Sequence, residues 1–177
     1  GLATTFGTGG LSSYLFAHRI LEATLQLVQQ SLTTASLPVL SKDYLEGKRK
    51  EYRAIMKKYI TILGTLGAVI SGIIFLFREE IIFLLYGETG FNDLILFFLC
   101  GFLLLLPFVM ISGYVSIGLY ASKDTKTVFV SMLISTITCV LVGVFTKSLG
   151  MISLLYAYGS WAITNFLLLS VLYSRKK

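Results

Sequence analysis

The residues with the clearest chemistry lie inside the first long apolar stretch of the sequence, residues 11–40. This stretch contains six charged or strongly polar side chains: His18, Arg19, Glu22, Gln26, Gln29 and Gln30. A charged side chain at the centre of a membrane-spanning helix costs roughly 3 kcal/mol by insertion scales, so it is expected to face a protein interior or a water-filled cavity. We therefore expect the function of the chain to depend on this stretch.

Helical spacing predicts that most of these side chains share one face. Residues three or four positions apart lie above one another on a helix. The polar face contains Arg19, Glu22, Gln26, Gln30 and Thr33, with His18 and Gln29 beside it. The opposite face contains Leu21, Leu25, Val28 and Leu32. The pattern predicts a helix with one side toward lipid or protein core and the other toward water.

Two interpretations of this polar face remain open. In the first, it lines a cavity in which Arg19 binds an anionic group of a substrate, and phosphate suits the planar fork of guanidinium donors. In the second, Arg19 and Glu22 form a structural ion pair that locks neighbouring helices. His18 is open in the same way, because it can sense pH or relay protons, or it can be a hydrogen-bonded structural residue.

The rest of the chain predicts an all-α bundle of membrane-spanning helices. Hydrophobic residues make up 55% of the sequence and charged residues only 14%. Apolar runs of about 20 residues, the length needed to cross the hydrocarbon core, recur between short charged clusters. We predict five spans, over residues 11–40, 59–77, 94–121, 127–146 and 151–173.

The charged clusters predict how the spans are oriented. Residues 41–58 contain seven Lys or Arg against three Asp or Glu, whereas residues 78–93 contain one against four. Residues 123–126 and 175–177 are again net positive. Because Lys and Arg are retained on the cytoplasmic side, the amino-terminal end of the chain is expected outside the cytoplasm and the carboxyl-terminal end inside.

Two further stretches keep alternatives open. Aromatic and aliphatic residues among the charges of residues 41–58 fit either a short amphipathic helix in the headgroup region or a solvated connector. Hydroxyls on the fourth span, Ser131 and Ser135 among them, are expected to bond to their own helix backbone. Asn165 on the last span either bonds across helices or lines a cavity.

Catalytic, cofactor and nucleic-acid signatures are missing from the sequence. It has no paired Cys or His at metal-ligand spacing, no nucleophile elbow and no phosphate-binding loop. Its net charge of +6 comes from residues at the edges of apolar runs, which favours lipid headgroups over nucleic acid as the partner. Cys100 and Cys139 lie inside apolar runs and are expected to be small buried hydrophobes. We predict neither an enzyme nor a bound cofactor or metal.

Four landmarks in the same order resemble the MurJ (MviN) lipid II flippases of the MOP exporter superfamily. The first two are the segments from Tyr14 to Glu22 and from Ser31 to Lys42, which are similar to the family's Tyr-Ala-Asp-Arg-Leu-x-Glu pattern and its Thr-x-x-x-Pro-x-Leu-Ser ending. The third, from Leu84 to Phe91, resembles a Leu-Phe-x-x-Gly-x-Phe loop. The fourth, from Gly118 to Thr127, resembles a Phe-Tyr-Ala-x-x-Asp-Thr-Lys-Thr-Pro junction.

The resemblance implies that residues 1–177 are one membrane segment, covering about helices eight to twelve of a fourteen-helix, two-lobed transporter of the bacterial cytoplasmic membrane. The missing helices of that transporter would be its partners, with membrane lipids. The implied function is the flipping of an undecaprenyl-pyrophosphate-linked peptidoglycan precursor by alternating access. The cavity-facing Arg of the family, thought to meet the lipid pyrophosphate, corresponds to Arg19, and its companion acid corresponds to Glu22.

Departures from the family pattern make the expected cavity wall more polar. His18 stands where the family has an acid, and Thr24, Gln26 and Gln29 stand at its Pro and Gly positions. Some family members bind a cation near the places of Gly143 and Lys147, so sodium coupling is not expected here. Two alternatives therefore stay open: a flippase for another lipid-linked oligosaccharide, or a membrane scaffold subunit that transports nothing.

Overall fold

The computed structural model describes residues 8–87 and 93–174, and these residues form helices joined by short turns. The elements in chain order are α1 (Thr8–Leu25), the π-helical turn η2 (Gln26–Gln30), α2 (Ser31–Leu45), α3 (Arg49–Leu76), α4 (Arg78–Tyr86), α5 (Asp93–Ala121), α6 (Thr125–Phe145), the 3-10 turn η4 (Lys147–Leu149) and α7 (Ile152–Ser174). No strand occurs in the described ranges. The prediction of an all-α helical membrane bundle is confirmed.

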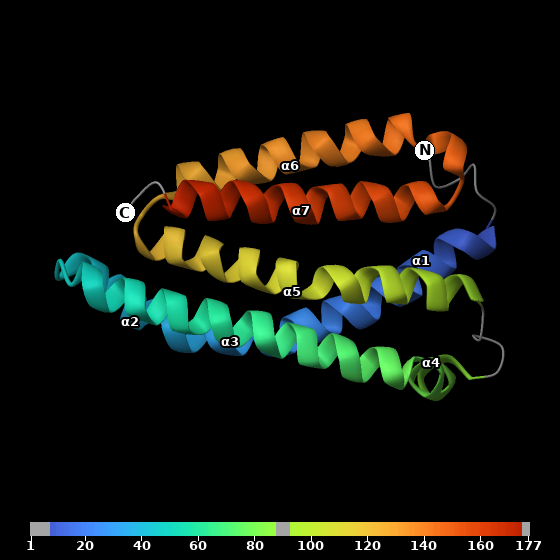
Figure 1. The fold of residues 1–177 in the computed structure, drawn as a ribbon, viewed down its shortest axis with the longest axis horizontal. Coiled ribbons are helices and arrows are strands. Elements are labelled where there is room, and N and C mark those ends of the chain that lie inside the picture. The colour runs from blue at the N-terminus through green and yellow to red at the C-terminus, as the bar shows by residue number, and fades with distance from the viewer. Residues whose placement is uncertain (1–7, 88–92, 175–177) are drawn as a thin grey trace.

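Helix α5 lies at the centre of the bundle. It contacts α1, α2 and α3 on one side and α6 and α7 on the other, and the long helices run side by side along the molecule (Figure 1). Its buried side chains include the large Phe98, Phe102 and Tyr114. Burial on both sides explains why this helix is apolar almost all round, whereas a helix that borders the core on one side carries only an apolar stripe.

Four of the five predicted spans correspond to helices long and apolar enough to cross a membrane, namely α3, α5, α6 and α7. The first predicted span is the exception. Its residues form α1, η2 and α2, which together run along the bundle (Figure 1). Charged and amide side chains interrupt its apolar surface, and the π-helical turn divides it, so neither α1 nor α2 counts as a span by itself.

Residues 41–58 form neither of the two structures expected for them. Their first part completes α2 and their last part is the start of α3, with a tight turn at Gly47 between them. Gly47 has a φ of 74°, a left-handed conformation that glycine adopts without a Cβ penalty. The span predicted over residues 59–77 lies within α3, which begins ten residues earlier because its first turns are helical but carry charges.

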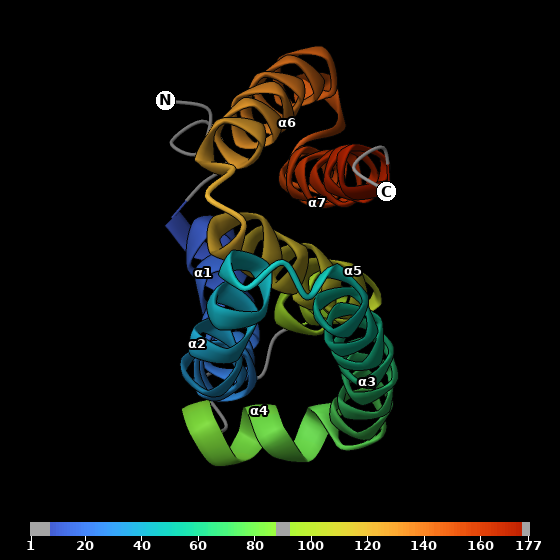
Figure 2. The same ribbon diagram turned by 90° about the vertical axis from the view of Figure 1, so that its left-hand side faces the viewer.

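Helix α4 was not predicted, since its Arg-Glu-Glu start reads as a loop. It runs across one end of the bundle, at a large angle to the long helices (Figure 2). The three remaining predictions match α5, α6 and α7 to within two residues at each end. Charge clusters or glycines border these apolar runs, so the ends of the three helices can be predicted from the sequence.

The basic clusters of the described chain gather at one end of the bundle. The turn between α2 and α3, which contains Lys48, and the turn between α5 and α6, which contains Lys123, lie at this end (Figure 1). The acidic start of α4, with Glu79 and Glu80, lies at the other end. The orientation of these two ends in the membrane stays a prediction from the charges of the sequence.

Candidate functional site

A groove lined by both apolar and polar side chains runs between the first helical stretch and the α5 to α7 part of the bundle. Its volume is about 710 Å³. The wall from the first stretch consists of Leu25, Gln26, Gln29, Gln30, Thr33 and Thr34. The facing wall consists of Val109, Ser112, Gly113, Ser116, Ile117 and Tyr120 of α5, Val128 and Met132 of α6, and Trp161 and Asn165 of α7. Amides, hydroxyls and one indole thus share the lining of one groove with apolar side chains.

The three glutamines lie on the π-helical turn η2. A π-helical turn is wider than an α-helical one and is frequently found at functional sites. The hydroxyl of Thr33 donates to the carbonyl of Gln29 at 2.6 Å, and that of Thr34 to the carbonyl of Gln30 at 3.0 Å, so side chains bond to the backbone carbonyls of the turn. Within the described chain, none of the three side-chain amides has a hydrogen-bond partner.

Gly113 lets the glutamine wall come close to α5. A Cβ at this position would clash with the side-chain amide of Gln29. The amide of Gln29 therefore lies directly over the α5 backbone, where any other residue would displace it. The sequence placed Gln29 beside the polar face; in the structure it lines the groove and its amide lies against Gly113.

The facing wall offers hydroxyls that are already oriented. Ser112 donates to the carbonyl of Val109 at 3.0 Å, and Ser116 to the carbonyl of Ser112 at 3.0 Å. A serine hydroxyl that donates to a backbone carbonyl keeps lone pairs to accept a further hydrogen bond. Asn165 accepts from Ser131 at 3.4 Å and also lines the groove, so both alternatives left open for it are realised.

His18 lies outside the groove, in an aromatic cluster that joins α1, α5 and α7. Its ring stacks on Tyr14 with centroids 5.8 Å apart and meets the edges of Phe102 at 5.5 Å and Tyr158 at 5.4 Å. Its Nδ1 lies 3.5 Å from Oε1 of Glu22. His18 is thus both packed and paired with an acid.

Arg19 and Glu22 are exposed on α1, and they precede the groove-lining residues in the sequence. Neither lines the groove, whereas Gln26 and Gln30 do. The Glu22 carboxylate, whose side chain is 54% exposed, pairs with His18. No ion pair or hydrogen bond of Arg19 occurs in the part of the chain that the structure describes, so the Arg19–Glu22 pair considered from the sequence does not form there.

Comparison with known proteins now assigns the chain. The sequence model of the family described as lipid II flippase MurJ matches residues 1–177, which is the whole chain. The chain belongs to the MurJ family of lipid II flippases. A probable lipid II flippase MurJ from Buchnera aphidicola subsp. Baizongia pistaciae (strain Bp) is 31% identical over 173 residues. That match covers 92% of the chain and 33% of the relative, so the chain spans about a third of this curated relative's length.

No solved structure matches the chain. Membership of the family, with the four apolar helices, supports a multi-pass inner-membrane protein. MurJ flippases are transporters, in agreement with the prediction of a protein that is not an enzyme. Among the described residues, no group of three or more His, Cys, Asp or Glu is placed to hold a metal ion.

The sequence alone missed part of the facing wall. Ser112 and Ser116 on α5, and Trp161 on α7, were not singled out. A signal for the serines exists, since they are four residues apart in an otherwise apolar helix and flank Gly113. Nothing in the spacing of Trp161 shows that it faces the glutamines, because contacts between helices are not encoded in the periodicity of one helix.

Proposed function

We propose that this segment forms part of the pathway by which the full-length protein flips lipid II, an undecaprenyl-pyrophosphate-linked peptidoglycan precursor, by alternating access between two lobes. The observation that carries the proposal is the glutamine wall of the groove. Three amides without partners among the described residues line a 710 Å³ cavity next to a line of hydroxyls. Family membership favours lipid II as the substrate.

The chemistry of the groove suits the polar head of such a substrate. Each glutamine amide can donate two hydrogen bonds and accept two, and each serine or threonine can do both. Sugar hydroxyls and peptide amides need the same mixture of donors and acceptors. An apolar lipid tail needs none of it and remains in the bilayer, so the groove would carry the head group alone.

Arg19 would meet the pyrophosphate of the substrate. It is exposed on the same helical stretch as the glutamines, and among the described residues no carboxylate neutralises it. Bidentate bonds from a guanidinium to phosphate oxygens are stronger than bonds between neutral groups. Glu22 and His18 would set the local charge beside Arg19 through their 3.5 Å contact.

The same proposal includes a fifth crossing and an orientation. The stretch α1–η2–α2 would cross the membrane with its polar face toward a water-filled cavity between the lobes of the transporter, which lowers the cost of Arg19 and the glutamines. The end of the bundle with the basic turns would face the cytoplasm. The amino-terminal end of the segment would then lie outside.

Replacement of Arg19 tests the proposal. In the full-length protein, Arg19→Ala is expected to abolish growth of a strain depleted of its own flippase, because the pyrophosphate loses its counter-charge. Arg19→Lys is expected to be impaired as well, since an ammonium cannot offer the two parallel donors of guanidinium. Membrane abundance, measured by immunoblot, should match that of the wild type.

Arg78→Ala is the matched control for this experiment. It also removes an arginine, but at the turn between α3 and α4, where Arg78 donates to the carbonyl of Phe75. The control should support growth. Normal growth with Arg19→Ala would rule out the proposed role of Arg19.

A further inference from the structure

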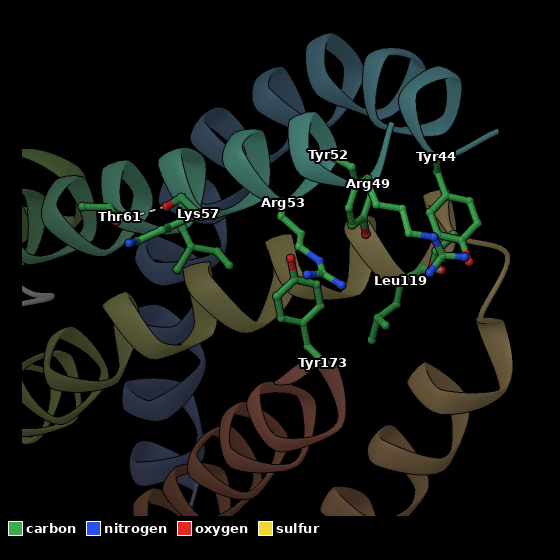
Figure 3. Close-up of a pocket in the computed structure, with 10 residues that line it drawn as sticks. Tyr44, Arg49, Tyr52, Arg53, Lys57, Thr61, Leu119 and Tyr173 are labelled. Carbon is green, nitrogen blue, oxygen red and sulfur yellow. Dashed lines mark hydrogen bonds between the residues drawn. The ribbon is translucent and has the colours of Figure 1, made fainter. Parts of the chain in front are cut away.

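A second pocket lies at the basic end of the bundle, away from the glutamine wall. Its volume is about 770 Å³, and residues of α3, α5 and α7 and the end of α2 line it (Figure 3). Arg49, Arg53 and Lys57 of α3 contribute its charge. Their spacing of four residues keeps them along one side of α3, and Figure 3 shows Arg53 extending toward Tyr173 of α7.

Three basic side chains give the pocket a positive charge. No acidic residue is among those that line it. The nearby carboxylate of Glu46 is held by Lys48 at 2.6 Å, and this hydrogen bond lowers the pKa of Glu46, so the carboxylate stays ionised and occupied. Arg49 lies over the ring of Tyr44, with its Cζ 5.4 Å from the centroid, and makes no ion pair within the described chain.

Part of the pocket lining is apolar, which distinguishes the pocket from a site for a free ion. The apolar side chains are Ile60 of α3 and Leu119 of α5. In α3, the charged turns end at Lys58 and apolar turns follow, so the pocket lies where a headgroup region meets hydrocarbon. Tyr44 and Tyr173 also line the pocket, and tyrosines are frequent at membrane interfaces.

We propose that this pocket binds the phosphate headgroup of an anionic glycerophospholipid, with the first part of the lipid's chains over Ile60 and Leu119. Arg49 and Arg53 bind the phosphate oxygens, and Lys57 contributes its charge. The site is independent of the proposed flipping function, since it shares none of its lining residues with the glutamine groove. A bound lipid would join α3 to α7 across α5.

The test measures lipid binding to the purified full-length protein in detergent, with no substrate present. Dioleoyl phosphatidylglycerol is titrated, and bound lipids are counted by native mass spectrometry. Arg49→Gln with Arg53→Gln is expected to weaken binding roughly 10-fold to 30-fold, since each basic residue near anionic lipid contributes about 1 kcal/mol. Arg49→Lys with Arg53→Lys should recover most of the affinity.

Lys50→Gln with Lys58→Gln is the matched control. It removes the same charge from the exposed surface of the same helix, outside the pocket. Its affinity should stay within about 2-fold of the wild type, because a charge outside the pocket acts only through screened solvent. Equal weakening by both double variants, or no weakening by the pocket variant, would overturn the proposal.

Two competitors identify the source of the phosphate. Dioleoyl phosphatidylcholine, which carries no net charge, should bind far more weakly than phosphatidylglycerol. Glycerol phosphate should displace phosphatidylglycerol only at concentrations far above that of the lipid, because it lacks the acyl chains that would cover Ile60 and Leu119. Displacement at equal concentration would show a site for free phosphate and refute the lipid assignment.

Discussion

At the scale of single residues, the glutamines of η2 are the least expected feature of a membrane helix. An amide in an apolar environment without a hydrogen-bond partner loses about 1 to 3 kcal/mol by mutational measures. Nothing within the described chain compensates the amides of Gln26, Gln29 and Gln30. Water or a passing ligand is the partner that removes this cost.

Leucines at two of these positions are expected to reduce flipping while leaving the fold intact. Gln26→Leu with Gln30→Leu keeps the approximate side-chain volume and removes the hydrogen-bonding groups. At about 1 kcal/mol for each hydrogen bond, the substrate should bind roughly 10-fold more weakly or worse. The accessibility of lipid II at the outer face of intact cells measures the effect.

The neighbouring Leu27 provides the control. Leu27 is 75% exposed and does not line the groove, although it belongs to the same turn. Leu27→Gln adds an amide outside the groove and should leave flipping unchanged. Wild-type lipid II accessibility in the double leucine variant would show that the groove does not hold the substrate.

Much of this wall could be predicted from the sequence, because helical spacing fixes which side chains share a face. Gln26 and Gln30 were expected on the polar face and both line the groove. Leu21 was expected on the apolar face and is 2% exposed. The π-helical turn could not be predicted, since the hydrophobic pattern of residues 26–30 fits an α-helix equally well. The position of Gly113 against Gln29 required the arrangement of the helices.

At the scale of elements, the junction between α5 and α6 contains two neighbouring residues with opposite effects on stability. Lys123 has a φ of 61°, a left-handed conformation that costs a non-glycine residue roughly 1 to 2 kcal/mol. Asp124 follows and caps α6, accepting a hydrogen bond from the backbone N–H of Thr127 at 3.2 Å. The turn therefore combines one strained residue with one stabilising cap.

Two substitutions at this junction should change stability in opposite directions. Lys123→Gly should raise the free energy of unfolding by about 1 kcal/mol, because glycine adopts positive φ without strain. Asp124→Ala should lower it by about 1 kcal/mol through loss of the cap. Thermal unfolding of the full-length protein in detergent measures both.

Lys126→Ala is the control for these two variants. Lys126 is exposed in the first turn of α6 and caps nothing, so its replacement should change the unfolding midpoint little. A fall in stability on Lys123→Gly would contradict the prediction. It would mean that the lysine side chain stabilises the fold by more than its backbone strain destabilises it.

Among the elements, the apolar part of each helix was easier to predict than the residues at which the helix begins and ends. The sequence marks where a span is apolar, so α5, α6 and α7 were found with nearly correct ends. It does not mark helices that continue into charged segments, as α3 does at Arg49, or that lie across the bundle, as α4 does (Figure 2). Such helices are stabilised by capping and tertiary packing rather than by an apolar run.

At the scale of the whole molecule, the separation of charge between the two ends makes orientation testable. Single cysteines are introduced at Lys50, near the basic end, and at Glu79, near the other end, after replacement of the native cysteines. Both positions are exposed. A membrane-impermeant thiol reagent applied to intact spheroplasts should label Glu79→Cys and spare Lys50→Cys, because basic loops are retained in the cytoplasm.

Inverted membrane vesicles supply the complementary measurement. There the same reagent should label Lys50→Cys and spare Glu79→Cys. Labelling of Lys50→Cys in spheroplasts would reverse the proposed orientation and place the basic lipid pocket at the outer leaflet.

The hydrogen bonds between helices have a mechanical consequence for the bundle. Within the described chain, side-chain hydrogen bonds connect α3 to α5, α4 to α1 and α6 to α7. Contacts such as Phe108 with Phe166 hold the α6–α7 hairpin to α5 through ring packing. Packed side chains exchange neighbours in small steps, as in the shear motions of other proteins, whereas a hydrogen bond must break before it re-forms. The α6–α7 hairpin is therefore the part of this bundle whose packing against α5 a sliding motion would disturb least.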